Sequence, residues 1–230
     1  MQKLGRMISE ELMRDYKLIR MDIGEDAHLK AKGFVFTTES YEVQGAGHLC
    51  IMEMHAMLGL MKMETVILSS FDKDMPLYNL DRVIVPGKIT QIAELYDTQL
   101  STYPGHHLDE FRAIADRDSD MEDYISAGEH WYDRILYPCS YHKTGRRSIL
   151  RAGNKSDISA RMDETAARHI HTFVSQIKTA EVCDKEQKRN KVREFADNLI
   201  SHGGPAVDQV TRLFGSEISE RLIRNHMYGV

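Results

Sequence analysis

The sequence has few cysteines, and their positions do not suggest a shared site. Cys50, Cys139 and Cys183 lie far apart, and none of them belongs to a CxxC pair. Such a set supports neither a disulfide framework nor a zinc knuckle. It is typical of a reducing compartment, so we expect the protein in the cytoplasm.

Long apolar runs and a basic surplus are also missing. No window approaches the ~18 consecutive apolar residues of a transmembrane helix, and charges interrupt residues 1–19, which argues against a signal peptide. We therefore expect no membrane partner. The chain has 35 acidic residues against 30 basic ones, for a net charge of −5. A nucleic-acid-binding domain would need excess positive charge to neutralise phosphates, so we expect no nucleic acid partner either.

Familiar cofactor and catalytic motifs are absent as well. The GAG at residues 45–47 lacks the rest of a dinucleotide fingerprint, and no GxxxxGK[ST], GxSxG or HExxH is present. His169 and His171 are two residues apart on a predicted helix, which puts them on different faces. The sequence thus predicts a colourless protein without tightly bound flavin, haem or metal.

Hydrophobic periodicity predicts a helical start and a strand-rich middle. Apolar residues recur at helical spacing through residues 1–19, which predicts an amphipathic helix. Between about residues 32 and 100, short apolar segments alternate with turn-prone stretches, which predicts five or six strands. The connections are too short for crossover helices, so we expect antiparallel pairing. Several strands are apolar on both faces, which indicates helices on both sides of the sheet.

The second half of the chain is predicted to be helical. Two short helices are expected at residues 107–117 and 128–137, and longer apolar stripes follow at residues 158–182, 190–200 and 207–222. No repeat or low-complexity linker divides the chain. We therefore expect one α+β domain over residues 1–230, a three-layer α/β/α sandwich with a central antiparallel β-sheet flanked by helices.

Two stretches resemble the ferredoxin-dependent bilin reductases. MPLYNLDRVIVPGKITQIAELYDTQL (residues 75–100) is similar to the family segment in which an LPxFGxD-type strand end precedes two more strands. GGPAVDQVTRLFGSEISERLIRNHMYGV (residues 203–230) is similar to the family's C-terminus, where an Asn-Asp dipeptide is followed by about ten residues, FGxEW and a short helix. The order and spacing of the two stretches together carry the resemblance.

This resemblance implies both a fold and a chemistry. The family, to which red chlorophyll catabolite reductase is related, has the α/β/α sandwich and reduces double bonds of open-chain tetrapyrroles. The implied partners are a linear tetrapyrrole (bilin) and ferredoxin or flavodoxin, with electrons arriving singly and protons coming from pocket side chains. One alternative is a non-catalytic protein of the same fold that binds a bilin or a haem-derived tetrapyrrole. Another is an enzyme with unrelated chemistry on this scaffold.

The resemblance implies catalytic roles for Asp81 and Glu53. Asp81 matches the family's pocket aspartate, and a desolvated carboxyl there can donate a proton near neutral pH; the structural alternative is a strand-end aspartate that pairs with Arg82 or caps a turn. Glu53, within CIMEM, matches the glutamate beside the chromophore; the alternative is an ion pair. Strand periodicity puts His55 on the face of Glu53, where it would relay protons or bind a pyrrole carbonyl. We expect Glu53 and Asp81 to line one cavity between the sheet and the C-terminal helices.

Other family positions differ in this chain. Counting back from Asp81, the family's histidine falls at Glu64 or Thr65, and Gly204 occupies the place of the helical aspartate. His202 and Asp208 are the nearby substitutes for that aspartate.

A basic cluster follows the segment YPCSYH. It includes Arg146 and Arg147, which are candidates to bind the two propionates of a bilin, since arginines bind carboxylates bidentately. Alternatively, this cluster receives an acidic ferredoxin or is a solvated basic loop.

Overall fold

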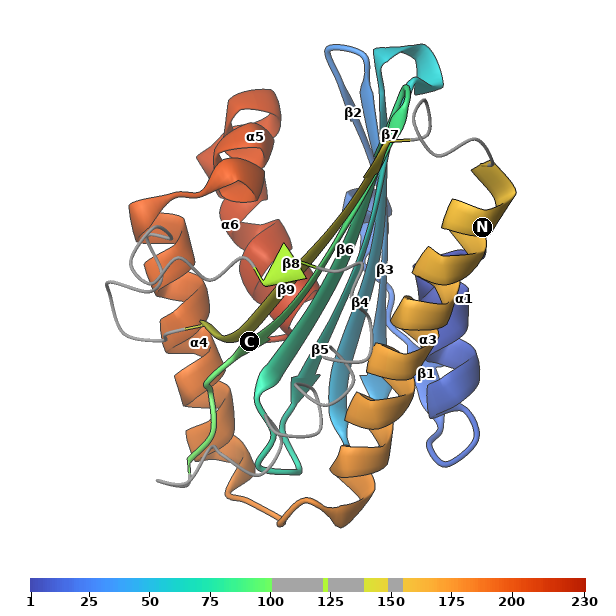
Figure 1. The fold of residues 1–230 in the computed structure, drawn as a ribbon. Helices are drawn as coiled ribbons and strands as arrows, with labels where there is room; N and C mark the ends of the chain where they lie inside the picture. The colour runs from blue at the N-terminus through green and yellow to red at the C-terminus, as the bar shows by residue number, and fades with distance from the viewer. Residues whose placement is uncertain (101–121, 124–138, 149–154) are drawn as a thin grey trace.

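A computed structural model describes residues 1–100, 122–123, 139–148 and 155–230. Within these residues a single sheet runs through the molecule, with every pair of neighbouring strands antiparallel (Figure 1). Its strands are β1 Leu18–Arg20, β2 His28–Ala31, β3 Phe34–Val43, β4 Gly47–Ala56, β5 Met61–Ser70, β6 Leu77–Val85, β7 Lys88–Tyr96, β8 Glu122–Asp123 and β9 Cys139–Ser148. They lie in the order β1-β3-β4-β5-β6-β7-β9-β8, and β2 pairs with β3. The predicted antiparallel sheet between residues 32 and 100 is confirmed.

The helices lie on both sides of this sheet (Figure 1). They are α1 Leu4–Leu12, α3 Lys155–Thr179, α4 Lys185–His202, α5 Pro205–Phe214 and α6 Ser216–Arg221, followed by the π-helix η4 Leu222–Tyr228. Short 3-10 helices occur at η1 Gly24–Ala27 and η2 Met57–Gly59. Helices α1 and α3 cover one face, and α4, α5 and α6 lie on the other. The α+β class is confirmed, whereas residues 107–117 and 128–137 lie outside the described residues.

The opening helix is shorter than the sequence predicted. It ends at Leu12, and the chain turns so that the amide of Tyr16 donates to the carbonyl oxygen of Leu12. Ile19, expected on the helix, instead pairs with Glu42 as part of β1. Edge-strand hydrogen bonds to β3 therefore replace the last predicted helical turns.

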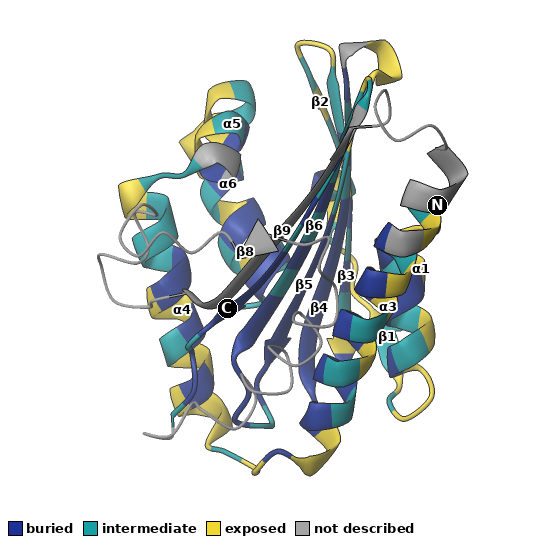
Figure 2. Ribbon diagram, viewed as in Figure 1, coloured by how far each residue is buried: buried dark blue, intermediate teal, exposed yellow. Residues whose placement is uncertain are grey.

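Each face of the sheet has its own apolar core, and the helices bury the sides that face the sheet (Figure 2). Alternation along β4 shows this directly, because Leu49 and Ile51 pack with α1 and α3 while Cys50 and Met52 pack with α4, α5 and η4. The first face is called the α3 face below, and the second the α4 face.

A buried lysine fixes α4 against the sheet. The ammonium of Lys188 is fully buried, lies 3.3 Å from Asp74 Oδ1, and donates to the carbonyl oxygens of Met75 and Thr98, both at 2.6 Å. Burial lowers its pKa to about 8. Asp184 caps the start of α4 by accepting from the amide of Gln187. Together these contacts hold α4 over the carboxyl ends of β5 and β7.

None of the helices in the described part of the chain is both long enough and apolar enough to cross a membrane.

Candidate functional site

Asp81 lies in the middle of β6 on the α4 face. Its neighbours across the strands are Thr65 on β5 and Ile92 on β7, and Thr65 in turn pairs with Met52 of the α4-face core. The hydroxyl of Thr65 donates to Asp81 Oδ1, and the amide of Asn79 donates to Asp81 Oδ2 at 2.9 Å. Two neutral donors thus hold the carboxyl of Asp81.

A second carboxyl shares one of these donors. The Asn79 amide nitrogen also donates to Glu94 Oε2 at 2.9 Å, and the hydroxyl of Tyr96 donates to the same oxygen at 2.7 Å. Residues two apart on a strand point to the same face, which holds for Asn79 and Asp81 on β6 and for Glu94 and Tyr96 on β7. Because Asn79 pairs with Glu94, all four side chains point to one face of the sheet. We call this set the carboxyl network; its members are Thr65, Asn79, Asp81, Glu94 and Tyr96.

The surroundings of Asp81 raise its pKa. Burial, the largest cause, and the nearby Glu94 carboxylate outweigh the hydrogen bonds from Thr65 and Asn79, which lower the pKa, and the net value is about 6. Asp81 nevertheless keeps part of its surface accessible. A partly accessible carboxyl with such a pKa can exchange a proton near neutral pH.

Aromatic side chains from the C-terminal half cover one end of the network. The ring centroids of Tyr96 and Phe195 are 4.8 Å apart, and those of Phe195 and Tyr228 are 5.4 Å apart. Tyr228 is buried in η4, and its pKa is raised by burial and by the charges of Asp81 and Glu94. Helix α4 and η4 therefore shield this end of the network from solvent.

Toward the β4–β5 hairpin the same face is less tightly closed. Met63 and Val83 on the strands, and Leu199, Leu213 and Phe214 on α4 and α5, all remain partly exposed. Met63, Leu199, Leu213 and Phe214 also pack against the α4-face core. These partly exposed apolar side chains belong to the same side of the sheet as Asp81.

No family model matches this sequence, and no curated protein matches it either. A search of solved structures gives a clear result. The structure of phytochromobilin synthase from tomato in complex with biliverdin matches 99% of this chain and 83% of that chain, with a TM-score of 0.68 and 11% sequence identity. The chain has the fold of phytochromobilin synthase.

Within this phytochromobilin synthase fold, Glu53 and His55 lie on the α3 face. Glu53 accepts from the Lys3 ammonium at 2.7 and 2.9 Å, and His55 Nε2 lies 3.8 Å from Glu53 Oε2. Glu53 pairs with Glu64 across β4 and β5, whereas Asp81 pairs with Thr65, so the two carboxyls project from opposite faces. The prediction that Glu53 and Asp81 line one cavity is therefore wrong, and Glu53 forms the ion pair that was its alternative.

The pair of Asp81 with Arg82, one of its structural alternatives, is also wrong. Arg82 points to the α3 face, where it is fully buried and pairs with Asp163 of α3 at 3.0 Å. Its guanidinium also donates to Gln91 Oε1 at 3.1 and 2.9 Å. Asp81 and Arg82 are neighbours in sequence but separated by the sheet.

The strand register decides which residue stands where the family's histidine was expected. Thr65, and not Glu64, faces Asp81. His202 is exposed at the last residue of α4, with its Nδ1 3.0 Å from the Asn198 carbonyl oxygen, and Asp208 on α5 is exposed as well. Gly203 between them has a φ of +74°, and a Cβ at that position would lie 2.6 Å from Asp208 Oδ1. Glycine is thus the residue that fits this turn.

Arg146 and Arg147 occupy consecutive positions of β9, opposite Thr90 and Ile89 of β7. Their side chains lie outside the described part of the structure, so their role as propionate ligands stays a prediction.

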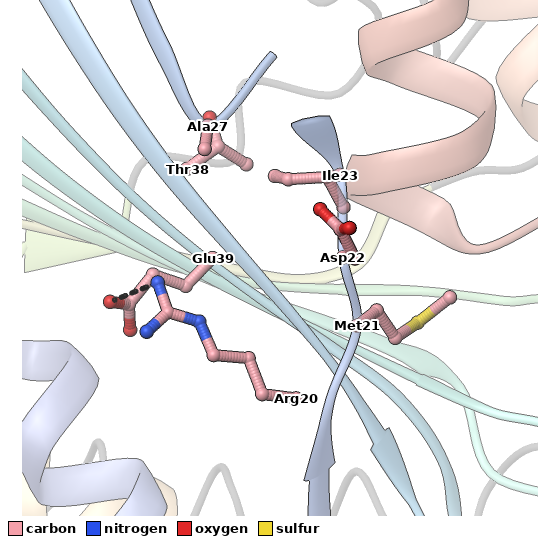
Figure 3. A pocket seen from close by; sticks show the side chains of 7 residues that line it. All are labelled: Arg20, Met21, Asp22, Ile23, Ala27, Thr38 and Glu39. Carbon is pink, nitrogen blue, oxygen red and sulfur yellow. Dashed lines mark hydrogen bonds and ion pairs between the residues drawn. The ribbon is translucent and has the colours of Figure 1, made fainter. Parts of the chain in front are cut away.

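A separate pocket lies at the edge of the sheet, where β1 and η1 leave β3 (Figure 3). It has a volume of about 340 Å³ and is lined by Arg20, Met21, Asp22, Ile23, Ala27, Thr38 and Glu39. Arg20 and Glu39 form an ion pair of 3.2 Å there. None of these residues belongs to the carboxyl network, so the pocket is distinct from the Asp81 site.

Sequence reasoning missed Asn79, Glu94 and Tyr96. The available signal was the alternation of polar residues in YNLD and AELY, which puts two hydrogen-bonding side chains on one face of each strand.

Proposed function

We propose that this chain binds an open-chain tetrapyrrole against the α4 face of the sheet and reduces one of its double bonds. The observation that carries the proposal is Asp81, a partly accessible carboxyl with a pKa of about 6 on a fold shared with a biliverdin-bound protein. The resemblance of residues 75–100 to bilin reductases, which marks Asp81 independently, supports it as well.

The partly exposed apolar side chains on the α4 face suit such a ligand. A bilin is a large conjugated molecule with apolar ring faces, and Met63, Val83, Leu199 and Phe214 offer apolar side chains for it. Pockets for ligands of this kind are mostly apolar, with a few polar groups that fix the orientation. In this arrangement Asp81 would face the ring system from the sheet side.

The proposed chemistry combines electrons from a protein donor with protons from the site. Reduced ferredoxin or flavodoxin would deliver electrons one at a time, and each added electron makes the bound bilin more basic. The Asp81 carboxyl then gives its proton to the bilin and becomes a carboxylate. Reduction of one double bond consumes two electrons and two protons, so the site must be protonated a second time.

A second candidate function is tetrapyrrole binding without reduction. Two observations favour it. Thr65 stands opposite Asp81 where the family has a histidine, and Gly203-Gly204 stands in place of the family's Asn-Asp dipeptide. Neither threonine nor glycine can supply a titratable proton, so fewer acids surround the ligand than the resemblance implied.

Two measurements test these functions. Absorbance titration with biliverdin measures binding, and an anaerobic assay with reduced ferredoxin measures reduction. We expect Asp81→Asn to bind biliverdin with similar affinity and to lose reduction by ~10² or more, because the variant keeps the shape but not the proton. Glu64→Gln, a carboxyl change on the α3 face, is the matched control and should leave both unchanged.

The outcomes separate the candidates. Tight binding without turnover in the unmodified protein would support the non-catalytic function, and failure to bind any tetrapyrrole would reject both. Full turnover in Asp81→Asn would show that another group protonates the bilin.

A further inference from the structure

Two leucines at the β4–β5 connection are exposed to solvent. Leu58 is fully exposed, and Leu60 is 58% exposed. Leu58 also has a φ of +56°, in the left-handed region that a residue with a Cβ enters at a cost in free energy. Packing within the protein therefore gives no reason for a leucine at position 58, because its side chain is not buried and its backbone conformation is unfavourable.

A second turn lies beside these leucines at the same end of the sheet (Figure 1). Because Val35 of β3 pairs with His55 of β4, the β2–β3 connection and the β4–β5 connection are neighbours. Both connections are largely exposed (Figure 2). On them, or on the strand residues next to them, are the exposed side chains of Lys30, Lys32 and Lys62.

This end of the sheet is basic although the chain as a whole is acidic. Residues 27–36 and 54–63 contain three lysines and neither aspartate nor glutamate, whereas the net charge of the whole chain is −5. The acids that border these two ranges bind other groups: Asp26 pairs with Arg221, Glu53 pairs with Lys3, and Glu64 accepts from the Leu4 amide. We call residues 27–36 and 54–63 the basic tip.

We propose that the basic tip binds the surface of an anionic membrane. In this contact the three lysines are attracted to the negative lipid headgroups, and Leu58 and Leu60 enter the boundary between the headgroups and the acyl chains. The charges bring the tip to the surface, and burial of the two leucines removes apolar area from water. The contact does not depend on the proposed function.

This contact changes the expectation, drawn from the sequence, that the protein has no membrane partner. That expectation rested on the missing apolar run and the missing signal peptide, and a surface contact requires neither. The sequence could not reveal that Leu58 and Leu60 stay outside the core, or that strand pairing brings the lysines of two hairpins together.

An acidic protein and a second copy of this chain are the competing occupants of the basic tip. Charge alone would fit an acidic protein, but Trp, Tyr and Arg dominate the energetics of protein interfaces, and leucine is under-represented there. A stable protein interface also buries about 800 Å² on each partner, whereas the basic tip consists of two narrow turns. A fluid bilayer can close around such a tip. The exposed leucines therefore favour the membrane.

Co-sedimentation with lipid vesicles tests the proposal on the full chain, without tetrapyrrole or ferredoxin. One set of vesicles contains equal parts of phosphatidylcholine and phosphatidylserine, and the other contains phosphatidylcholine alone. We expect reversible binding to the first set at about 1 mM lipid, and binding to the second set that is weaker by about tenfold or more. Raising the salt concentration to about 0.5 M should weaken the first binding, because salt screens the lysines.

Two variants separate the charges from the apolar side chains. Lys30→Gln, Lys32→Gln and Lys62→Gln together should weaken binding to the anionic vesicles by about 10²-fold at low salt, since each lysine contributes about fivefold. Leu58→Asn with Leu60→Ser should weaken binding by about tenfold at low and at high salt. Asparagine tolerates the left-handed conformation, so the turn is kept.

The matched control is Met13→Ser with Val182→Ser. These side chains are 56% and 78% exposed, and they lie after α1 and between α3 and α4, at the opposite end of the sheet (Figure 1). This variant should bind vesicles as the unmodified protein does. Asp81→Asn, which tests the proposed function, should bind them equally well. Far-UV circular dichroism shows whether each variant is folded.

No sedimentation with the anionic vesicles at low salt would overturn the proposal, and so would an equal loss of binding in the control variant. A dimer that Leu58→Asn with Leu60→Ser dissociates, in a protein that binds no vesicles, would assign the tip to a second copy. Ferredoxin binding that the lysine variant abolishes, again without vesicle binding, would assign it to an acidic protein. Because the vesicle assay contains no tetrapyrrole, its failure and the failure of the proposed function are distinguishable.

Discussion

The two faces of the sheet carry similar residues in different electrostatic settings. On the α3 face, Arg82 pairs with Asp163 and Glu53 pairs with Lys3. On the α4 face, Asp81 is held by the neutral side chains of Thr65 and Asn79 and is repelled by Glu94. The comparison shows ion pairs that compensate charge on the α3 face, whereas on the α4 face burial and a neighbouring carboxylate raise the pKa of Asp81.

The largest effect on folding is expected on the α3 face. Asp163→Ala leaves the fully buried guanidinium of Arg82 without its ion-pair partner, and we expect the free energy of unfolding to fall by about 3 kcal/mol. Urea denaturation measures this loss. The double variant Arg82→Met with Asp163→Leu should recover most of it, since no charge is then buried. A loss below about 1 kcal/mol in the single variant would show that water or another group compensates the charge.

On the α4 face, removing a carboxyl should raise the free energy of unfolding instead of lowering it. The folded-state pKa of Asp81, about 6, lies above its ordinary value of 3.8, so the folded protein binds this proton more tightly than the unfolded chain does. Stability from Asp81 is then complete below pH 4 and is lost as the pH rises to about 6. We expect Asp81→Asn to be more stable than the unmodified protein by about 2 kcal/mol at pH 7, and by much less near pH 4. Urea denaturation at several pH values tests this; a pH-independent difference would contradict it.

The smallest effect is expected at the exposed ion pair of the α3 face. Lys3 is largely exposed, so Glu53→Gln should lower the free energy of unfolding by only about 0.5 kcal/mol. The same variant should bind biliverdin as before, because residue 53 does not reach the α4 face. A loss of binding would restore the role that the family resemblance assigned to Glu53 and would break the contrast between the faces.

Much of the fold could be predicted from local patterns. Short apolar strands with tight connections can hardly pair in any way but antiparallel. Side-chain alternation also separated Glu53 from Cys50 within β4. These inferences needed only neighbouring residues, which is why they are confirmed.

The register in which neighbouring strands pair could not be predicted in the same way. The β4–β5 hairpin pairs Ala56 with Met61, and β5 pairs Thr65 with Asp81. A shift of one residue in either register would have brought Glu53 to the face of Asp81. Such a shift depends on turn geometry, as in the positive φ of Leu58 at the β4–β5 connection, which no hydrophobic pattern reveals. Glu94 was missed for a related reason, since a polar residue in a strand is usually assigned to solvent.

The π-helix η4 has a consequence for how this protein can change during evolution. Its wider turn places Leu222, Ile223, Met227 and Tyr228 in the buried layer, with Tyr228 near the carboxyl network. Removing one residue from Leu222–Tyr228 would rotate the residues after the deletion around the helix axis, and their apolar side chains would leave the buried layer. Apolar substitutions in this segment should therefore be tolerated far better than insertions or deletions. Selection would then act more strongly on the number of residues in this segment than on their identity.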